Sequence, residues 1–293
     1  MSFDIVTDSP ANLPADLIEK YGIHVLNLPI FAGATEYPSY EKGRDSYQMF
    51  YDMMLAGQEL TSSQTGPAEC ERVFGGILAR GRDLLYLGFS STLSGTYQNA
   101  AIAAADLREK YPERKVLTVD TLSASAAQGL LVLKAADMRG EGRGIEETAA
   151  WVEENRLRVC HYFTVDDLKY LRRGGRISGS AAAMGTVLSI KPVLTMDRNG
   201  RLVPAGKVRG RKAALNALVE YMREKLDLSA ELSASDPPVF IAHADCPDDA
   251  AYLEGRIKEL YGTPEVRTVM LNPLIGSHTG PGTIALFFFC KER

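Results

Sequence analysis

The sequence predicts an α/β fold with two domains: a Rossmann-like N-terminal domain with a parallel sheet, and a C-terminal α/β domain with a mixed sheet. In the first half, short runs rich in β-branched residues alternate with helical patterns, which is typical of a parallel sheet covered by helices. In the second half, Asn199-Gly200 separates two strand-like runs and is a strong signal for an antiparallel hairpin. A chain of 293 residues is long enough for two such domains. We place their boundary near residue 156, giving domains 1–156 and 157–293.

The expected elements follow the chain in order. The first domain has strand-like runs at F-D-I-V-T-D, H-V-L-N-L-P-I-F, D-L-L-Y-L-G-F-S and K-V-L-T-V-D. Its helical patterns lie near 14–21, 46–56, 67–80 and 94–110, with another after residue 120. The second domain has expected strands at 159–164, 191–196, 201–208, 238–244, 265–271 and 283–290. Its expected helices lie near 166–172, 179–188, 210–226 and 247–261, and residues 229–238 read as a surface loop.

The composition is that of an ordinary globular protein, with 45% apolar and 24% charged residues. The longest apolar run, Ile284 to Cys290, is far shorter than the roughly 20 residues that span a bilayer, and no basic-then-apolar leader begins the chain. We therefore expect a cytoplasmic protein without stable membrane insertion. Its four cysteines lack C-x-x-C spacing and neighbouring histidines, which favours buried free thiols over a zinc site or a disulfide framework.

A basic segment stands out in this acidic chain of net charge -4. Residues 169–212 hold eleven Lys or Arg residues and a single acid, Asp197. One hypothesis is a nucleic-acid surface, but the overall acidity and the lack of interleaved aromatics apart from Tyr170 argue against it. We expect no nucleic-acid partner.

Small hydroxyl side chains follow the predicted strands of the first domain. They occur in Thr7-Asp8-Ser9, Ser90-Ser91-Thr92 and Asp120-Thr121, and a further cluster, T-S-S-Q-T-G-P, occupies residues 61–67. In open α/β sheets, ligands bind outside the carboxyl ends of the strands. These hydroxyls are therefore expected to line a cleft, although the 61–67 cluster also suits an ordinary turn before a helix that starts at Pro67.

Ser94, Gly95 and Thr96 open the alanine-rich helix. Backbone N–H groups and the positive end of the helix dipole at that position would suit an anion. The alternative is that Ser94 serves only as the N-cap of the helix. The two roles are compatible.

His278 lies in a glycine- and proline-rich stretch, L-I-G-S-H-T-G-P-G, which we interpret as a loop leading into a buried strand. It has three candidate roles: a hydrogen-bond donor to an anion, a nucleophile, or a structural histidine satisfied by the backbone. His24, His161 and His243 fall in predicted strands and are interpreted as structural. In L-R-R-G-G-R-I-S, the arginines, including Arg176, are candidates for pairing with a carboxylate or phosphate, or are simply solvated.

Four segments in this order resemble one family. They are I-V-T-D-S near the N-terminus, S-S-T-L-S-G-T-Y from Ser90, L-R-R-G-G-R-I-S from Leu171, and H-T-G-P-G from His278. With I-K-P at 190–192 and K-V-R at 207–209, the chain resembles the DegV family of fatty-acid-binding proteins over nearly its whole length. Each motif is weak alone, but the ordered set is specific.

The resemblance implies a long-chain fatty acid, C14 to C18, buried in the protein with its carboxylate held by hydroxyl side chains. It implies a carrier that presents this carboxylate to the ATP-binding subunit of a bacterial fatty acid kinase, and passes acyl-phosphate to an acyltransferase of phospholipid synthesis. Such a protein catalyses nothing by itself and needs no cofactor or metal. A buried acyl tail contributes about 0.8 kcal/mol per CH2, and the hydroxyls keep the headgroup hydrogen-bonded.

The motifs carry the family's ligand residues onto this chain. Ser94 matches the carboxylate-binding serine, while Arg176 and His278 match residues near the carboxylate and the partner surface. The second hydroxyl is Ser62 or Thr61, because T-S-S-Q-T-G-P departs from the family's T-S-Q-P-S. The complete set of expected ligand-binding residues is Thr61, Ser62, Ser63, Ser91, Ser94, Gly95, Thr96, Arg176, His278 and Thr279.

A second hypothesis makes the protein an enzyme or covalent binder of a small carbonyl or phosphoryl substrate. In this alternative His278 attacks a carbonyl or accepts a phosphoryl group, as in fold relatives of the family that handle dihydroxyacetone. Retained lipid in a His278→Ala variant favours the carrier, and loss of a covalent adduct favours the enzyme.

Overall fold

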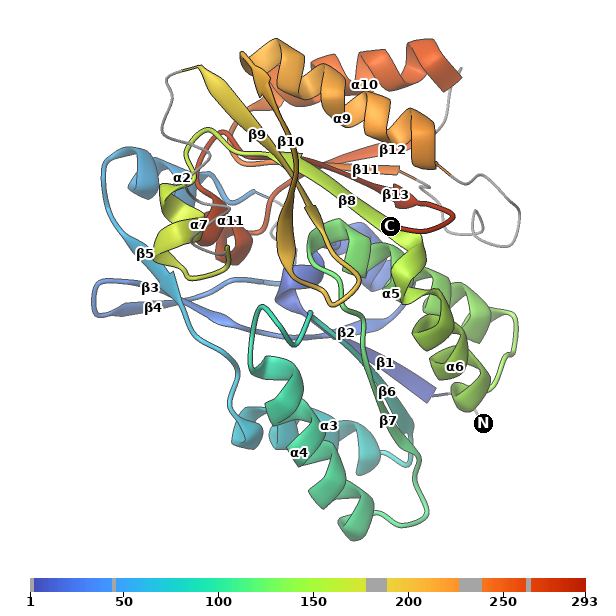
Figure 1. The fold of residues 1–293 in the computed structure, drawn as a ribbon. Helices are drawn as coiled ribbons and strands as arrows, with labels where there is room; N and C mark the ends of the chain where they lie inside the picture. Colours follow the sequence, from blue (N-terminus) through green and yellow to red (C-terminus); the bar gives the residue numbers. More distant parts are fainter. Residues whose placement is uncertain (1–2, 44–45, 178–188, 227–238, 262–264) are drawn as a thin grey trace.

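The computed structural model describes residues 3–43, 46–177, 189–226, 239–261 and 265–293, and shows an α/β fold built on a parallel and a mixed sheet (Figure 1). Sheet A has the strand order β2-β1-β6-β7, with every pair parallel. Its strands are β1 (Phe3–Asp8), β2 (Ile23–Leu26), β6 (Asp83–Gly88) and β7 (Val116–Asp120). The order reverses between β1 and β6, which is where a doubly wound sheet binds ligands.

Helices cover both faces of sheet A. They are α1 (Ala15–Lys20), α3 (Pro67–Leu78), α4 (Thr96–Lys110), α5 (Ser125–Gly140) and α6 (Ile145–Asn155). Helices α3 and α4 pack on one face, while α5 lies on the other, between sheet A and the second large sheet (Figure 1). Thirteen of the sixteen residues of α5 are buried, which fits a helix with a sheet on either side.

The run H-V-L-N-L-P-I-F was expected to form one strand, and this prediction was wrong. It forms the end of β2 and the start of β3 (Pro29–Ala32), which belong to different sheets. Pro29 has no N–H group to continue the ladder, and the Asn27 carboxamide bonds the chain at Tyr40 instead. The small antiparallel sheet B has the order β4-β3-β5, with β4 (Thr35–Pro38) and β5 (Leu60–Ser62). Helix α2 (Gln48–Leu55) lies between β4 and β5 in the chain.

Sheet C has the order β10-β9-β8-β13-β11-β12 and is antiparallel except between β11 and β12. Its strands are β8 (Val159–Thr164), β9 (Ile190–Met196), β10 (Leu202–Arg209), β11 (Val239–His243), β12 (Val266–Met270) and β13 (Ile284–Phe289). Two helices cover its outer face, α9 (Arg211–Lys225) and α10 (Pro247–Tyr261) (Figure 1). Two short helices, α7 (Lys169–Arg173) and α11 (Pro273–Thr279), pack against each other, and α11 lies beside β5.

The Asn199-Gly200 hairpin is confirmed: β9 and β10 pair antiparallel on either side of it. Gly200 has a φ of +77°, which glycine adopts without strain, and the Asp197 carboxylate accepts the backbone N–H groups of Asn199 and Arg201. The mixed sheet expected for the second half is therefore present. The expected helix at 179–188 and the expected loop at 229–238 lie outside the described residues.

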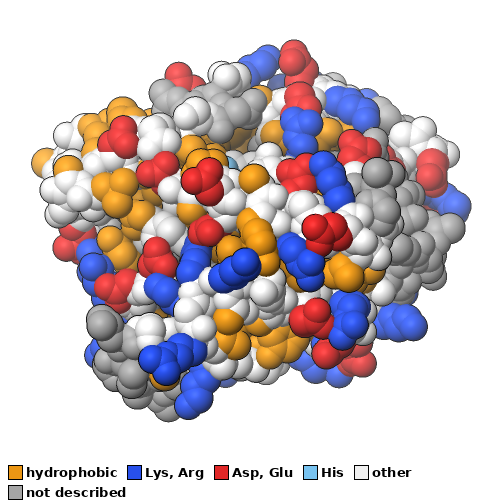
Figure 2. Space-filling view, turned by 90° about the horizontal axis from the view of Figure 1, so that it is seen from above, with side chains coloured by type: hydrophobic (Ala, Val, Ile, Leu, Met, Phe, Trp, Pro, Cys, Tyr) orange, Lys and Arg blue, Asp and Glu red, His pale blue; other side chains and the backbone are white. Residues whose placement is uncertain are grey.

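The strands of sheets A and B precede residue 121, and those of sheet C follow residue 158. The boundary after residue 156 itself stays a prediction, because α5 and the core around it contact both large sheets. Among the described residues no helix is both long and apolar enough to cross a membrane. On the face seen in Figure 2, basic and acidic side chains are interspersed.

Candidate functional site

A cavity of about 140 Å³, partly open to solvent, lies where sheet A, sheet C and α11 meet. Most of its wall is apolar and comes from segments far apart in the chain. The apolar lining residues are Leu28, Phe89, Leu93, Ala124, Phe163, Leu171, Met196, Leu202, Leu271, Leu274, Ile275, Ala285 and Phe287.

Polar side chains gather at one part of the wall. The Ser62 hydroxyl, at the end of β5, lies 2.7 Å from Nε2 of His278 on α11. The Arg176 Nε donates to the carbonyl oxygen of Leu93 at 3.1 Å, which places the guanidinium beside the loop that carries Ser94. We call Ser62, Ser94, Arg176 and His278 the polar end of the cavity.

The interpretation of residues 274–282 as a loop was wrong for its first part. Residues 273–279 form α11, capped by Asn272, whose side chain accepts the N–H of Leu274. Pro273 suits the first turn of a helix, where no donor is needed, and the glycines 280 and 282 follow its end. His278 therefore projects from the last helical turn. It is half-buried and reaches the cavity.

His278 is neutral at pH 7. Burial, together with the nearby cations of Arg176 and Arg173, lowers its pKa to about 4. A neutral imidazole has one donor and one acceptor nitrogen, so Nε2 can either donate to or accept from the Ser62 hydroxyl. The ring fits because residue 174 is a glycine: a Cβ at this position would lie 2.3 Å from Nδ1 of His278.

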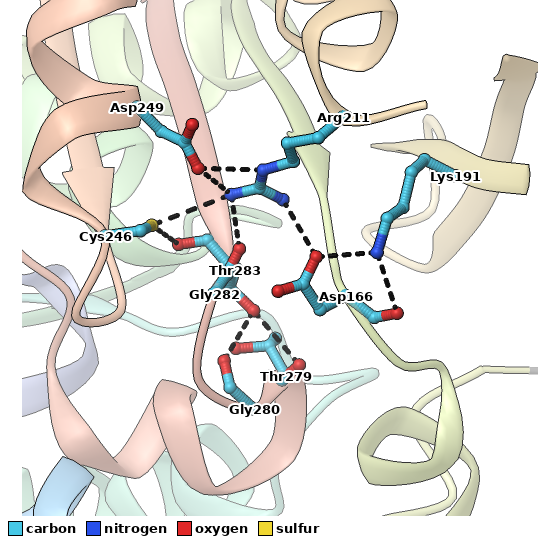
Figure 3. A network of polar contacts seen from close by, with 9 residues as sticks. All are labelled: Asp166, Lys191, Arg211, Cys246, Asp249, Thr279, Gly280, Gly282 and Thr283. Atoms are coloured by element: carbon cyan, nitrogen blue, oxygen red, sulfur yellow. Dashed lines mark hydrogen bonds and ion pairs between the residues drawn. The ribbon is translucent and has the colours of Figure 1, made fainter. Parts of the chain in front are cut away.

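A network of ion pairs holds the turn after α11 (Figure 3). Arg211 at the start of α9 pairs with Asp249 at 2.7 Å and donates to the carbonyl oxygen of Gly282 at 2.6 Å. Its Nη1 lies 3.5 Å from Asp166, which also pairs with Lys191 at 2.7 Å. The turn that follows His278 is therefore held by Arg211 of α9, which is itself fixed by Asp166 in the segment after β8.

Seven of the ten predicted ligand-binding residues line the cavity. They are Ser62, Ser63, Ser94, Gly95, Arg176, His278 and Thr279. Between the two alternatives at residues 61 and 62, the geometry brings Ser62 to the cavity, since Thr61 is exposed and successive side chains of a strand point to opposite faces.

Ser91 and Thr96 do not line the cavity either. Ser91 is held by the Asp120 carboxylate, which accepts its backbone N–H at 3.3 Å. Thr96 is fully buried, and its hydroxyl accepts the N–H of Thr65 at 3.2 Å. Thr96 thus joins the 61–67 segment to the start of α4.

The alternative that Ser94 is the N-cap residue of this helix is wrong, although its hydroxyl does accept a backbone N–H at the start of the helix. Helix α4 begins at Thr96 with Gly95 as its N-cap residue, and Ser94 lies one residue earlier. The Ser94 hydroxyl accepts the Thr96 N–H at 3.2 Å and also lines the cavity. A Cβ on Gly95 would come within 2.0 Å of the Gln64 carboxamide, so glycine permits this close approach.

The other hydroxyls expected at the rim form internal bonds. Ser9 and Ser39 lie 2.6 Å apart and are buried. Ser90 donates to the carbonyl oxygen of Gly200 at 2.9 Å, as does Thr92 at 2.5 Å, so both fasten the β9–β10 hairpin to sheet A. These side chains form internal hydrogen bonds and are not among the residues that line the cavity.

Sequence reasoning missed four polar residues that line the cavity: Gln64, Ser125, His161 and Thr283. His161 was interpreted only as a structural residue. The available signal was its place two residues from Phe163, which puts both side chains on the same face of β8. Cys70, Cys160 and Cys290 are buried thiols as expected, whereas Cys246 is partly exposed.

Five of the eleven cations of the basic segment form ion pairs within the described residues. Lys169 lies 3.1 Å from Asp167, and Arg173 lies 3.3 Å from Glu59. Arg198 pairs with Glu292. Lys191 and Arg211 also pair with acids, so several carboxylates partly neutralise the positive charge of this segment. Within the described ranges, no three His, Cys, Asp or Glu side chains gather as they would around a metal ion.

The fold and the cavity define a two-domain α/β protein with an apolar ligand chamber and a hydroxyl- and histidine-bearing end. Residues 2–291 match the family model described as "Uncharacterised protein, DegV family", and the chain belongs to this family. It is 40% identical, over 98% of its length and 97% of the relative, to a DegV domain-containing protein of Clostridium perfringens. Among solved structures, it is similar to a fatty-acid-binding DegV family protein of Thermus thermophilus, with 32% identity, 99% of this chain and 100% of that chain covered, and a TM-score of 0.83. It is also similar to DegV of Bacillus subtilis, a fatty-acid-binding protein, with 29% identity, 99% and 100% covered, and a TM-score of 0.83.

Proposed function

We propose that the protein binds one long-chain fatty acid in the cavity and presents its carboxylate to a fatty acid kinase in the bacterial cytoplasm. The single observation that carries this proposal is the cavity itself, an apolar chamber with Ser62, Ser94, Arg176 and His278 at one end. The two solved relatives described as fatty-acid-binding each cover 99% of this chain and support the same ligand class.

The acyl tail supplies most of the binding free energy. Each buried CH2 contributes about 0.8 kcal/mol, so a C14 to C18 tail can offset the cost of association without strong headgroup contacts. The wall from Phe89, Phe163 and Phe287 to Met196 offers the tail aromatic and flexible apolar side chains.

The headgroup lies at the polar end in this proposal. A buried carboxylate needs hydrogen-bond donors, and the hydroxyls of Ser62 and Ser94 supply two. With His278 neutral, the Ser62–His278 hydrogen bond orients the hydroxyl without adding a second charge. Arg176 adds the positive charge: burial lowers the pKa of its guanidinium, and arginine stays protonated in proteins.

The chain acts in this proposal as a carrier without catalytic activity. The carboxylate becomes an acyl-phosphate on a separate ATP-binding subunit, and an acyltransferase consumes the product. The cavity is partly open to solvent. In this proposal a phosphoryl donor approaches the headgroup at the polar end, whereas the tail stays in the apolar chamber.

The first test is mass spectrometry of an organic extract from protein purified without added lipid, compared with its intact native mass. One equivalent of a C14 to C18 acid is expected in the wild type. The Ser62→Ala/Ser94→Ala double variant is expected to lose it, whereas a Thr61→Ala/Ser91→Ala variant, altered outside the cavity lining, retains it. Empty wild-type protein would contradict the proposal.

The same experiment tests the covalent-enzyme alternative. A mass addition that survives denaturation and maps to His278 would replace the carrier proposal with the enzyme hypothesis. A His278→Ala variant that keeps its extractable lipid but no longer supports acyl-phosphate formation with a kinase subunit supports the carrier.

A further inference from the structure

The Arg293 side chain joins three segments that are far apart in the sequence. Its Nη1 donates to the carbonyl oxygen of Leu122 at 2.7 Å and to that of Asp197 at 3.3 Å. Its Nη2 donates to the carbonyl oxygen of Arg156 at 2.5 Å and to the Ser123 hydroxyl at 3.1 Å. The function proposed above assigns no role to this side chain.

The Arg293 guanidinium suits this set of acceptors because it is planar and charged. Burial lowers its pKa to about 10, so it is still a cation at pH 7. Charged donors form stronger hydrogen bonds than neutral ones, and a guanidinium holds its N–H groups in a fixed geometry. A lysine at this position has one compact ammonium group and cannot bond all three segments at once.

Two of the three segments continue directly into the cavity wall. Residues 122–123 are followed by Ala124 and Ser125, both of which line the cavity. Asp197 follows Met196, which lines the cavity at the end of β9. Ala124 and Met196 belong to one buried apolar cluster. The guanidinium therefore bonds the backbone next to a part of the wall that the loop and the β9–β10 hairpin form together.

The loop that Arg293 bonds contains strained backbone. Leu122 and Ser125 have φ values of +47° and +53°, a conformation that costs non-glycine residues free energy. Gly200, in the turn of the β9–β10 hairpin, lies against this loop, because a Cβ on Gly200 would come within 3.3 Å of the Leu122 Cα. The hydrogen bonds of Arg293 to Leu122 and Asp197 help to offset the strain and hold the loop against the hairpin.

Arg293 lies far from the polar end of the cavity. Thr283 bonds the turn after His278 and comes just before β13. Arg293 follows the other end of this strand, where its backbone N–H donates to the carbonyl oxygen of Leu157 at 3.1 Å. The six residues of β13 span about 20 Å. With the carboxylate at the polar end, Arg293 acts where the tail of a long acyl chain lies.

We propose that Arg293 is a positioning residue of the chamber, which holds the loop 122–125 and the β9–β10 hairpin in the geometry that contacts the distal part of a long acyl chain. It does not line the cavity itself, so it sets the preference for long over short chains through the wall. This inference rests on the proposed fatty-acid-binding function and adds a residue that determines its chain-length preference.

The test measures Kd by isothermal titration calorimetry with delipidated protein and the saturated acids C10, C12, C14, C16 and C18. In the wild type, Kd is expected to fall about fourfold for each added CH2 that the chamber buries. Arg293→Met removes the donors but keeps a long, unbranched side chain. We expect it to bind the C10 acid within about twofold of the wild type, and the C18 acid at least about tenfold more weakly.

The matched control is Arg198→Met. Arg198 is the neighbour of Asp197 in the same hairpin, but its side chain is 68% exposed and pairs with Glu292. This variant is expected to keep the wild-type Kd at every chain length, because a surface ion pair contributes little. Arg293→Lys keeps the charge without the set of hydrogen bonds, and it replaces Arg293→Met in the titrations if that variant does not fold. We expect it to lose affinity for the C18 acid as well.

A loss of affinity that is equal at every chain length would give Arg293 only a general role in stability and would overturn the inference. Wild-type affinity for the C18 acid in Arg293→Met or Arg293→Lys would also overturn it. In these cases the wild type still binds its acids, so the proposed function stands. Failure of the wild type to bind any of the five acids overturns the proposed function itself.

Discussion

The carboxyl group of Asp8 is fully buried at the end of β1. It accepts the Tyr86 hydroxyl at 2.7 Å, the Phe89 N–H at 2.9 Å and the Gln128 side-chain amide at 2.6 Å. Burial raises its pKa to about 6, against these hydrogen bonds, which lower it. Asp8 lies at the carboxyl end of a parallel strand, a position where ligands often bind. Here its carboxyl group instead forms hydrogen bonds that stabilise the sheet beneath the cavity.

The raised pKa of Asp8 makes stability depend on pH. Between the unfolded pKa of 3.8 and the folded pKa of about 6, the folded protein binds more protons, so this contribution is present below pH 3.8 and is lost as pH rises through 6. The full effect is about 3 kcal/mol. We expect Asp8→Asn to remove this part of the pH dependence.

Urea unfolding at pH 4.5 and pH 7.5 measures the effect as the difference between wild type and Asp8→Asn. The control is Asp106→Asn, an exposed residue of α4, which should change neither value by more than about 0.5 kcal/mol. If the wild type and Asp8→Asn show the same change with pH, Asp8 does not titrate in this range.

At the scale of elements, the turn after α11 depends on α9. Arg211 on α9 contacts Asp249, Asp166 and the carbonyl oxygen of Gly282 through one planar guanidinium (Figure 3). Lysine has a single ammonium group and cannot make these contacts together. The position of His278 at the cavity is thus decided partly by a side chain from another helix.

We expect Arg211→Lys to lower the free energy of unfolding by about 1–3 kcal/mol and to weaken fatty-acid binding several-fold, because the turn loses its fixed position. Calorimetric titration and urea unfolding measure the two effects. Arg223→Lys on the same helix is the control, since Arg223 pairs only at the surface with Glu220 in the described structure. Indistinguishable results for the two variants would show that the turn does not need Arg211.

At the scale of the whole molecule, α5 joins the two large sheets into one core. Leu131 is fully buried in the cluster that includes residues of both sheets. Leu131→Ala is expected to lower the free energy of unfolding by about 2–5 kcal/mol without changing the urea m-value. Ile102→Ala, on the solvent side of α4 where the side chain is 53% exposed, should have an effect near zero.

The unfolding curve of the same variants tests whether the domains unfold together. The single tryptophan, Trp151, lies on α6 and reports on the first domain, whereas circular dichroism reports on both. We expect the two transitions to coincide, because α5 packs against both sheets. A tryptophan transition at lower urea than the circular dichroism transition would indicate two independent units.

Much of the fold could be predicted from local sequence. The parallel strands of sheet A and the hairpin at Asn199-Gly200 were predicted because alternating element patterns and turn residues act over short distances. Sheet B was not predicted, because three short strands with a proline at the start of one leave little periodic signal. Helix α11 was also missed, since glycine and proline within it suggest a loop.

The sequence by itself determined the family, the ligand class that the family suggests, and most of the residues at the polar end. These could be read from the sequence because each motif, such as L-S-G-T or H-T-G-P-G, is a short continuous segment that contains its own functional side chains. Tertiary structure alone decided that Ser62 and not Thr61 reaches the cavity, because the alternation of β5 sets which side chain points inward. It also decided that His161 is part of the chamber. Its neighbours Ala124 and Phe287 come from distant segments, and only the packing of α5 against sheet C brings them together.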